Sequence, residues 1–172
     1  FLEIGSWEGR SACWLLQEIV TDPTSSLACI DPFTLTPAHR RGISETITPL
    51  PDDFEPERRF DANIATIGAV DRVIKLKGQS QAILRTLPVQ SYDCIYIDGS
   101  HAAPDVLTDA VLSWRLLKNG GILILDDYEL SLSPDRLAHP KIAIDAFLEI
   151  FSGRYDILER GWQMILRKKI SD

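Results

Sequence analysis

The chain lacks three features that would each have pointed to a class of protein. Its 172 residues include three cysteines, Cys13, Cys29 and Cys94, without a CxxC pair, so neither a disulfide framework nor a zinc site is indicated. Basic residues number 18 against 25 acidic ones, and the formal net charge of −7 leaves no broad basic footprint for nucleic acid. No apolar run approaches the roughly 18 residues that span a bilayer. We therefore expect a cytoplasmic protein with reduced core thiols that binds neither nucleic acid nor membrane.

The composition is that of one globular domain. With 45% hydrophobic and 25% charged residues, the chain has enough apolar side chains for a sizeable core, and we expect one domain over residues 1–172. Because Phe1 is not a methionine and already falls in a strand-like pattern, we expect an N-terminally truncated fragment. Lys168 and Lys169 form a short basic tail, which is typical of a solvated strand end. A homo-oligomer stays possible.

Short apolar runs alternate with helical patterns along most of the chain. The runs are typical of buried parallel strands: Phe1–Gly5, Leu27–Ile30, Val73–Lys77, Tyr92–Ile97 and Ile122–Leu125. The segments between them have the apolar spacing of helices: Ser11–Val20, Pro56–Gly68, Gln79–Thr86 and Ala103–Leu117. The remainder predicts a helix and two antiparallel edge strands: Pro140–Phe151, Arg154–Glu159 and Trp162–Arg167. This alternation predicts a doubly wound α/β fold, with a mostly parallel sheet of about seven strands and helices on both faces.

A long insertion interrupts this alternation. Residues Thr34 to Glu55 hold several prolines and few periodic apolar positions. Irregular insertions at strand ends usually act as lids or substrate loops, and we interpret this one as lid-like. A surface excursion without a role is the alternative.

Two glycines follow the first apolar run. Gly5 and Gly9 enclose three residues, and a helix pattern begins directly after them. A strand, a tight turn and a helix start make a nucleotide-binding crevice, in which free backbone N–H groups suit an anionic group. The dinucleotide fingerprint requires a third glycine, which Arg10 and Ser11 do not supply, so a nicotinamide cofactor is disfavoured. A turn needed only for helix–strand packing is the structural alternative.

Acidic residues stand at the ends of three predicted strands. Asp98 ends the fourth strand, Asp126 and Asp127 end the fifth, and these carboxylates should meet at the carboxyl edge of the sheet. Ionised carboxylates so close together repel one another unless a cation neutralises them, and all-oxygen ligands favour Mg²⁺. His101 lies three residues after Asp98, where it could take a proton from a bound hydroxyl; packing against the next helix is its alternative. Asp31 ends the second strand, where it could accept from ribose hydroxyls or cap the turn before Pro32.

These segments, in this order, resemble the Rossmann-like class I S-adenosylmethionine-dependent methyltransferases, and among them the small-molecule O-methyltransferases of the macrocin and catechol types. The resemblance rests on five segments: Glu3 to Gly9, Cys29 to Pro32, Lys77 to Ser80, Tyr96 to His101, and Asn119 to Tyr128. It implies S-adenosyl-L-methionine bound by Glu3, Gly5, Ser6, Gly9, Ser11, Asp31, Gln79, Ser80 and Asp98. It also implies a metal at Asp98, Asp126 and Asp127, with Asp98 and His101 as catalytic residues. Catechol-type enzymes carry asparagine where Asp127 stands, so the paired acids favour the macrocin type.

The resemblance implies a Mg²⁺-dependent O-methylation of a small-molecule or sugar hydroxyl. Alignment of the acceptor oxygen with the methyl donor, together with metal activation, would account for the catalysis without a covalent intermediate. Two alternatives remain: a cofactor-binding relative with another activity or none, such as the cephalosporin-hydroxylase type, and a module of a larger assembly protein.

Overall fold

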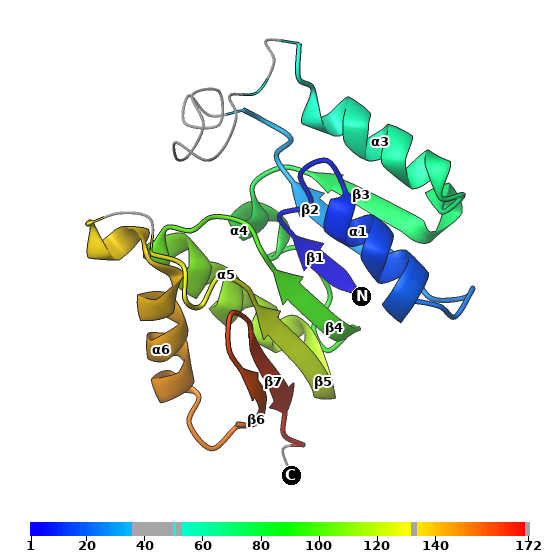
Figure 1. Cartoon of the computed structure of the whole chain (residues 1–172). Helices are drawn as coiled ribbons and strands as arrows, with labels where there is room; N and C mark the ends of the chain where they lie inside the picture. The colour runs from blue at the N-terminus through cyan, green and yellow to red at the C-terminus, as the bar shows by residue number, and fades with distance from the viewer. Residues whose placement is uncertain (36–49, 51–52, 132–133, 171–172) are drawn as a thin grey trace.

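The computed structural model describes residues 1–35, 50, 53–131 and 134–170. A seven-stranded sheet forms its centre, in the order β3-β2-β1-β4-β5-β7-β6 (Figure 1). The strands are β1 Leu2–Ile4, β2 Leu27–Asp31, β3 Val73–Lys77, β4 Tyr92–Ile97, β5 Leu117–Leu125, β6 Tyr155–Arg160 and β7 Met164–Lys168. The first five run parallel, whereas β7 pairs antiparallel with both β5 and β6. The predicted doubly wound sheet with an antiparallel edge hairpin is therefore confirmed.

Helices cover both faces of the sheet. The helical segments are α1 Arg10–Trp14, which continues as a π-helical turn over Leu15–Ile19, α3 Pro56–Thr66, α4 Ser80–Ile83, α5 Ala103–Leu116 and α6 Pro140–Ile150. Helices α1 and α3 lie together on one face, and α4, α5 and α6 lie on the other (Figure 1). Short 3₁₀ turns occur at Val70–Arg72 and Arg136–Ala138.

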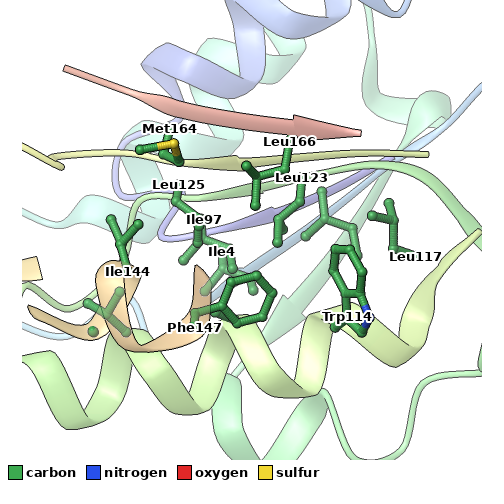
Figure 2. Packing of buried hydrophobic residues seen from close by; sticks show 14 of the residues in the cluster. Ile4, Ile97, Trp114, Leu117, Leu123, Leu125, Ile144, Phe147, Met164 and Leu166 are labelled. Atoms are coloured by element: carbon green, nitrogen blue, oxygen red, sulfur yellow. The ribbon is translucent and has the colours of Figure 1, made fainter. Parts of the chain in front are cut away.

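Two separate apolar clusters follow from the period of two along each buried strand. In β2, Ala28 and Ile30 belong to the larger cluster on the α5 side, whereas Leu27 and Cys29 belong to the cluster beneath α1 and α3. Figure 2 shows the larger cluster, in which Trp114 of α5 and Phe147 of α6 pack edge to face with their ring centroids 5.6 Å apart. All three cysteines are free thiols, as expected.

Two predicted elements differ in the structure. The predicted helix over Ser11–Val20 is helical, but its second half is π-helical, because the Val20 N–H donates to the Leu15 carbonyl five residues earlier. The predicted fifth strand began at Ile122, whereas β5 begins at Leu117. Its pairing with β4 shifts register between Tyr92 and Cys94, so the Asn119-Gly120-Gly121 segment is an irregularity within the strand.

The basic tail was also predicted wrongly at one position. Lys168 is buried rather than solvated, and its Nζ donates to the carbonyl oxygens of Trp114 and Leu117 at 2.7 and 2.8 Å. The Trp114 carbonyl belongs to the last turn of α5 and Leu117 directly follows this helix, at an end where a cation is favoured by the helix dipole. Most of the predicted insertion over Thr34 to Glu55 lies outside the described residues. Among those described, no helix is long and apolar enough to cross a membrane.

Candidate functional site

The candidate site lies at the carboxyl edge of the parallel strands. The strand order reverses direction between β1 and β4, and such a switch point opens a crevice outside the strand ends. Ile4, Ile97 and Leu125 are paired across β1, β4 and β5, so the residues that follow them start at one level. The loops after these strands therefore converge, as predicted.

The backbone at Gly5 approaches the end of β4 closely. Its φ is +90°, and a Cβ atom added to it would lie 2.0 Å from the carbonyl oxygen of Asp98. Only glycine can therefore bring the turn after β1 against the end of β4. Gly9, with φ +82°, packs in the same way against the ring of Phe60 in α3. Both glycines thus have the packing role that was the structural alternative, and the Gly5 turn lies directly beside Asp98.

Glu3 and Ser6 are buried beneath this turn. Glu3 is fully buried and Ser6 is 1% exposed. Neither carboxylate oxygen of Glu3 nor the hydroxyl of Ser6 makes a hydrogen bond of standard geometry among the described residues, although Ser11, Ser6 and Cys29 lie close to the Glu3 carboxylate. Burial raises the pKa of Glu3. Buried polar groups are seldom left unpaired, so a donor group of a ligand or an ordered water would fit at this turn.

Asp31 ties the ends of β1 and β2 together. Its Oδ2 accepts from the Trp7 N–H at 2.9 Å, and its Oδ1 accepts from the Phe33 N–H at 2.6 Å. The turn-capping alternative for Asp31 is therefore realised. Each carboxylate oxygen can accept more than one hydrogen bond, so the contact with ribose hydroxyls stays a prediction.

The turn after β3 meets α5. Ser80, the first residue of α4, donates its hydroxyl proton to Asp109, with Oγ 2.8 and 3.0 Å from the two carboxylate oxygens. Asp109 is 2% exposed, and burial raises its pKa to about 6. Gln79, which precedes Ser80, is exposed.

Asp98, His101 and Asp127 form a compact cluster in which their candidate ligand atoms all lie within 4.8 Å of one another. His101 Nε2 lies 2.9 Å from Asp127 Oδ2. Asp126 faces the same small pocket, but its carboxylate accepts from the Tyr96 hydroxyl, from Gln163 Nε2 at 3.0 Å and from the Asp127 N–H at 2.8 Å. Two of the three predicted carboxylates, Asp98 and Asp127, thus lie together in this cluster, and its third member is His101 rather than Asp126, which lines the same pocket.

The electrostatics of this cluster follow from its crowding. Burial, followed by the charge of Asp126, raises the pKa of Asp98 to about 7. The hydrogen bond with Asp127 raises the pKa of His101. Burial also raises the pKa of Tyr96, whose hydroxyl bridges Asp98 and Asp126. A divalent cation would relieve this repulsion, so the donor set fits a hard metal ion.

Comparison with known proteins assigns the family. The model of a family described as "Methyltransferase domain" matches residues 2–128 of the chain. The chain belongs to this methyltransferase domain family. The matched region of the methyltransferase domain contains the Gly5 turn, Asp31 and Ser80. It also contains Asp98, His101, Asp126 and Asp127, the pocket-lining residues that we call the acidic pocket.

Two curated relatives match the chain, and one of them carries a methyltransferase name. A protein of Mycobacterium sp. (strain JLS), named "Putative O-methyltransferase", is 30% identical over 128 residues, which are 72% of this chain and 46% of that protein. An uncharacterized protein, R132, of Acanthamoeba polyphaga mimivirus is 26% identical over 132 residues, which are 75% of this chain and 51% of that protein. The methyltransferase domain therefore spans about half the length of the curated relatives it matches.

Solved structures show the same fold. The O-methyltransferase NovP superposes with a TM-score of 0.74 at 18% identity, covering 99% of this chain and 72% of that one. TomG of Streptomyces achromogenes, an O-methyltransferase solved in complex with SAM, superposes with a TM-score of 0.66 at 18% identity, covering 98% and 72%. The architecture of the methyltransferase domain is shared with these enzymes.

Two residues of the site were missed at the sequence level. Asp109 shares the buried face of α5 with Val106, Ala110 and Ser113, and a carboxylate on an apolar helix face was a readable signal. Gln163, whose Nε2 donates to Asp126, lies in the β6–β7 turn, and nothing in the sequence indicated that this turn contacts the end of β5.

A second pocket lies beside the start of α3. It is lined by the described ends of the insertion, Thr34, Leu35 and Phe54.

Proposed function

We propose that this methyltransferase domain binds S-adenosyl-L-methionine and transfers its methyl group to a hydroxyl oxygen of a small molecule or sugar, with Mg²⁺ in the acidic pocket. The observation that carries the proposal is the contact between the glycine turn and the acidic pocket, since Gly5 lies against the backbone of Asp98. Family membership supports methyl transfer, and the SAM complex of TomG supports the cofactor.

The residues available for the cofactor follow the sheet edge in order. Glu3, Gly5, Ser6, Gly9 and Ser11 surround the turn where the methionine end would bind. The buried and unpaired oxygens of Glu3 and Ser6 fit a ligand with donor groups, such as an α-ammonium group or the water bound to it. Asp31, on the neighbouring strand β2, would accept from the ribose hydroxyls. Gln79 and Ser80, which follow β3, would contact the adenine base.

The predicted metal ligands are Asp98, Asp126 and Asp127; Asp98 and Asp127 belong to the cluster with His101, and Asp126 lines the same pocket. When bound, Mg²⁺ lowers the pKa of a coordinated hydroxyl and fixes its position. Asp98 would touch both the metal and the acceptor. His101 donates its Nε2–H to Asp127, so its free lone pair is on Nδ1, the atom that would take the acceptor's proton. At low pH the imidazole of His101 is protonated on both nitrogens and could not take this proton.

Transfer of a labelled methyl group tests the proposal. Labelled S-adenosylmethionine is incubated with a panel of hydroxylated sugars, phenols and polyketides, with Mg²⁺ or with EDTA. We expect a labelled ether product from at least one acceptor with Mg²⁺ and its loss in EDTA. Binding of S-adenosylhomocysteine without turnover of any acceptor would favour the alternative, a cofactor-binding relative with another activity or none. Equal turnover in EDTA would contradict the metal assignment alone.

A further inference from the structure

The hydroxyl of Ser80 is held in one orientation by a buried carboxylate. Ser80 Oγ lies 2.8 and 3.0 Å from the two oxygens of Asp109, and among the described residues Ser80 is the hydrogen-bond partner of this carboxylate. Asp109 is 2% exposed, while Ser80 is only half-buried. The Asp109 carboxylate is therefore covered, whereas the hydroxyl remains partly open to the surface.

A second carboxylate of α5 supports the same region. Asp105, one helical turn before Asp109, accepts from Gln81 Nε2 at 2.9 Å and from Ser100 Oγ at 2.8 Å. Helix α5 thus ties the start of α4 to the loop after β4 through two acidic side chains on one face. The position of Ser80 is consequently fixed relative to the acidic pocket.

The turn before Ser80 lies beside Asp31. The Gly78 N–H donates to the Asp31 carbonyl at 3.0 Å, and Asp31 and Lys77 are paired across β2 and β3. A nucleoside that bonds its ribose to the Asp31 carboxylate, with its remainder at the Gly5 turn, would extend its base along the edge toward this turn. Ser80 would then be a hydroxyl in reach of the base.

We propose that Asp109 is a positioning residue that makes Ser80 an obligate hydrogen-bond acceptor, so that the turn after β3 selects a purine with an amino group over one with a carbonyl group. The inference rests on the proposed binding of S-adenosylmethionine. Asp109, which would not itself contact the cofactor, would in this way determine whether the site prefers adenine or its deaminated form.

The chemistry follows from the inventory of a hydroxyl group. Serine has one O–H donor and two acceptor lone pairs, and an ionised carboxylate can only accept. The pKa of about 6 leaves Asp109 ionised at pH 8. The hydroxyl proton of Ser80 is therefore used in the hydrogen bond to Asp109, so Ser80 Oγ can only accept a hydrogen bond from the base. The amino group is the only N–H donor on the adenine ring system, whereas a carbonyl in its place would face Oγ as a second acceptor.

Calorimetric titration at pH 8 tests the proposal, with S-adenosylhomocysteine and S-inosylhomocysteine as the two probes. We expect the wild-type chain to bind the adenosyl compound about tenfold more tightly or better, since an acceptor facing an acceptor leaves a polar group unpaired. Asp109→Leu removes the acceptor and frees the Ser80 proton to donate to the carbonyl, so the ratio should fall to about threefold or less. Asp109→Asn keeps an acceptor oxygen and should restore the ratio.

Two further variants make the outcome decisive. Ser80→Ala should weaken S-adenosylhomocysteine binding and reduce the ratio as Asp109→Leu does, and it serves if Asp109→Leu fails to fold. Thr108→Val, the matched control, removes a hydroxyl that bonds to Pro104 within α5 and should leave both affinities unchanged. An unchanged ratio in Asp109→Leu or in Ser80→Ala overturns the inference and leaves cofactor binding intact. A wild-type chain that binds neither probe overturns the proposed function itself.

Discussion

Three non-glycine residues with positive φ mark the carboxyl edge of the sheet. Trp7, Phe33 and Asp127 have φ values of 47°, 51° and 59°, and each follows a parallel strand. The backbone N–H of each donates to an aspartate: Trp7 and Phe33 to Asp31, and Asp127 to Asp126. Such strain costs about 1–3 kcal/mol per residue and persists only where surrounding contacts impose it. Among the described residues, three of the four such positions therefore coincide with the loops that build the candidate site, and the fourth, Gln90, precedes β4.

Asp127→Asn separates the charge at this site from its backbone geometry. Asparagine tolerates a left-handed conformation as well as aspartate does, so we expect the melting temperature to stay within about 2 °C of wild type. Loss of one charged ligand should lower Mg²⁺-dependent methyl transfer by about 100-fold or more. Affinity for S-adenosylhomocysteine, measured by calorimetry, should stay within about twofold.

The matched control for this variant is Asp93→Asn. Asp93 lies near the opposite end of β4, is exposed and pairs with Lys118. Its substitution should leave turnover unchanged. Equal activity of Asp127→Asn and Asp93→Asn would remove Asp127 from the metal site.

Asp109 makes stability depend on pH. Burial raises its pKa to about 6, whereas the unfolded chain should titrate near about 3.9. The folded chain then binds more protons than the unfolded chain between these values, so the free energy of unfolding falls as the pH rises through this window. We expect Asp109→Asn to exceed wild type by up to about 3 kcal/mol at pH 7.5 and to match it near pH 3.5. Urea denaturation at both pH values measures this; an equal difference at both would contradict it.

At the scale of elements, Lys168 joins β7 to the end of α5. Its Nζ donates to the carbonyls of Trp114 and Leu117 and lies 5.1 Å from the centre of the Trp114 ring. Both carbonyls belong to buried residues at the end of the helix. The hairpin strand β7 thus satisfies backbone groups that α5 leaves open at its C-terminus.

Lys168→Met should therefore destabilise the chain, since it leaves two buried carbonyls unpaired at a cost of about 3 kcal/mol in the free energy of unfolding. The neighbouring Lys169, whose Nζ lies 3.2 Å from Asp156 Oδ1 on the surface, provides the control. Lys169→Met should change the free energy of unfolding by less than about 1 kcal/mol. Urea denaturation compares the two variants, and equal losses would show that the buried contact is worth no more than the surface pair.

The apolar runs of the sequence predicted the buried strands well. In β2, alternate side chains enter different apolar clusters, and the apolar run over Leu27–Ile30 revealed this strand. The antiparallel hairpin was also predicted, because its two apolar runs are short and close together. The start of β5 was not, because the predicted apolar run began only after Gly120 and Gly121, whereas β5 includes both glycines as an irregularity in its pairing with β4. Tertiary pairing overrode the local signal there.

The sequence predicted the candidate site only at residues that follow predicted strands, because the strand end fixes their place at the edge of the sheet. Asp98 and Asp127 were placed together because neighbouring parallel strands end at one edge. The partners of Asp126 and Ser80 could not be placed in the same way, since Gln163 lies 37 residues away and Asp109 lies 29 residues away along the chain. Such contacts depend on how a helix or hairpin packs on the sheet, which periodicity does not determine.

At the scale of the whole molecule, the acidic pocket and the glycine turn belong to one continuous sheet edge. Backbone hydrogen bonds from Gly5 to Ile30, from Asp98 to Ile4 and from Asp126 to Ile97 join the four central strand ends. A ligand along this edge would contact loops that belong to several parts of the chain. Its binding energy should therefore stabilise the whole fold cooperatively rather than one loop.

Ligand-induced stabilisation of the chain tests this expectation. S-adenosylhomocysteine at 100 times its dissociation constant should add about 2.7 kcal/mol to the free energy of unfolding, which corresponds to a rise of roughly 5–10 °C in the melting temperature for a domain of this size. NADH at the same concentration should give no rise, because the turn between Gly5 and Gly9 lacks the third glycine of the dinucleotide fingerprint. Differential scanning fluorimetry distinguishes the two ligands. A rise with NADH equal to that with S-adenosylhomocysteine would mean that the edge recognises an adenine nucleotide in general rather than a methyl donor.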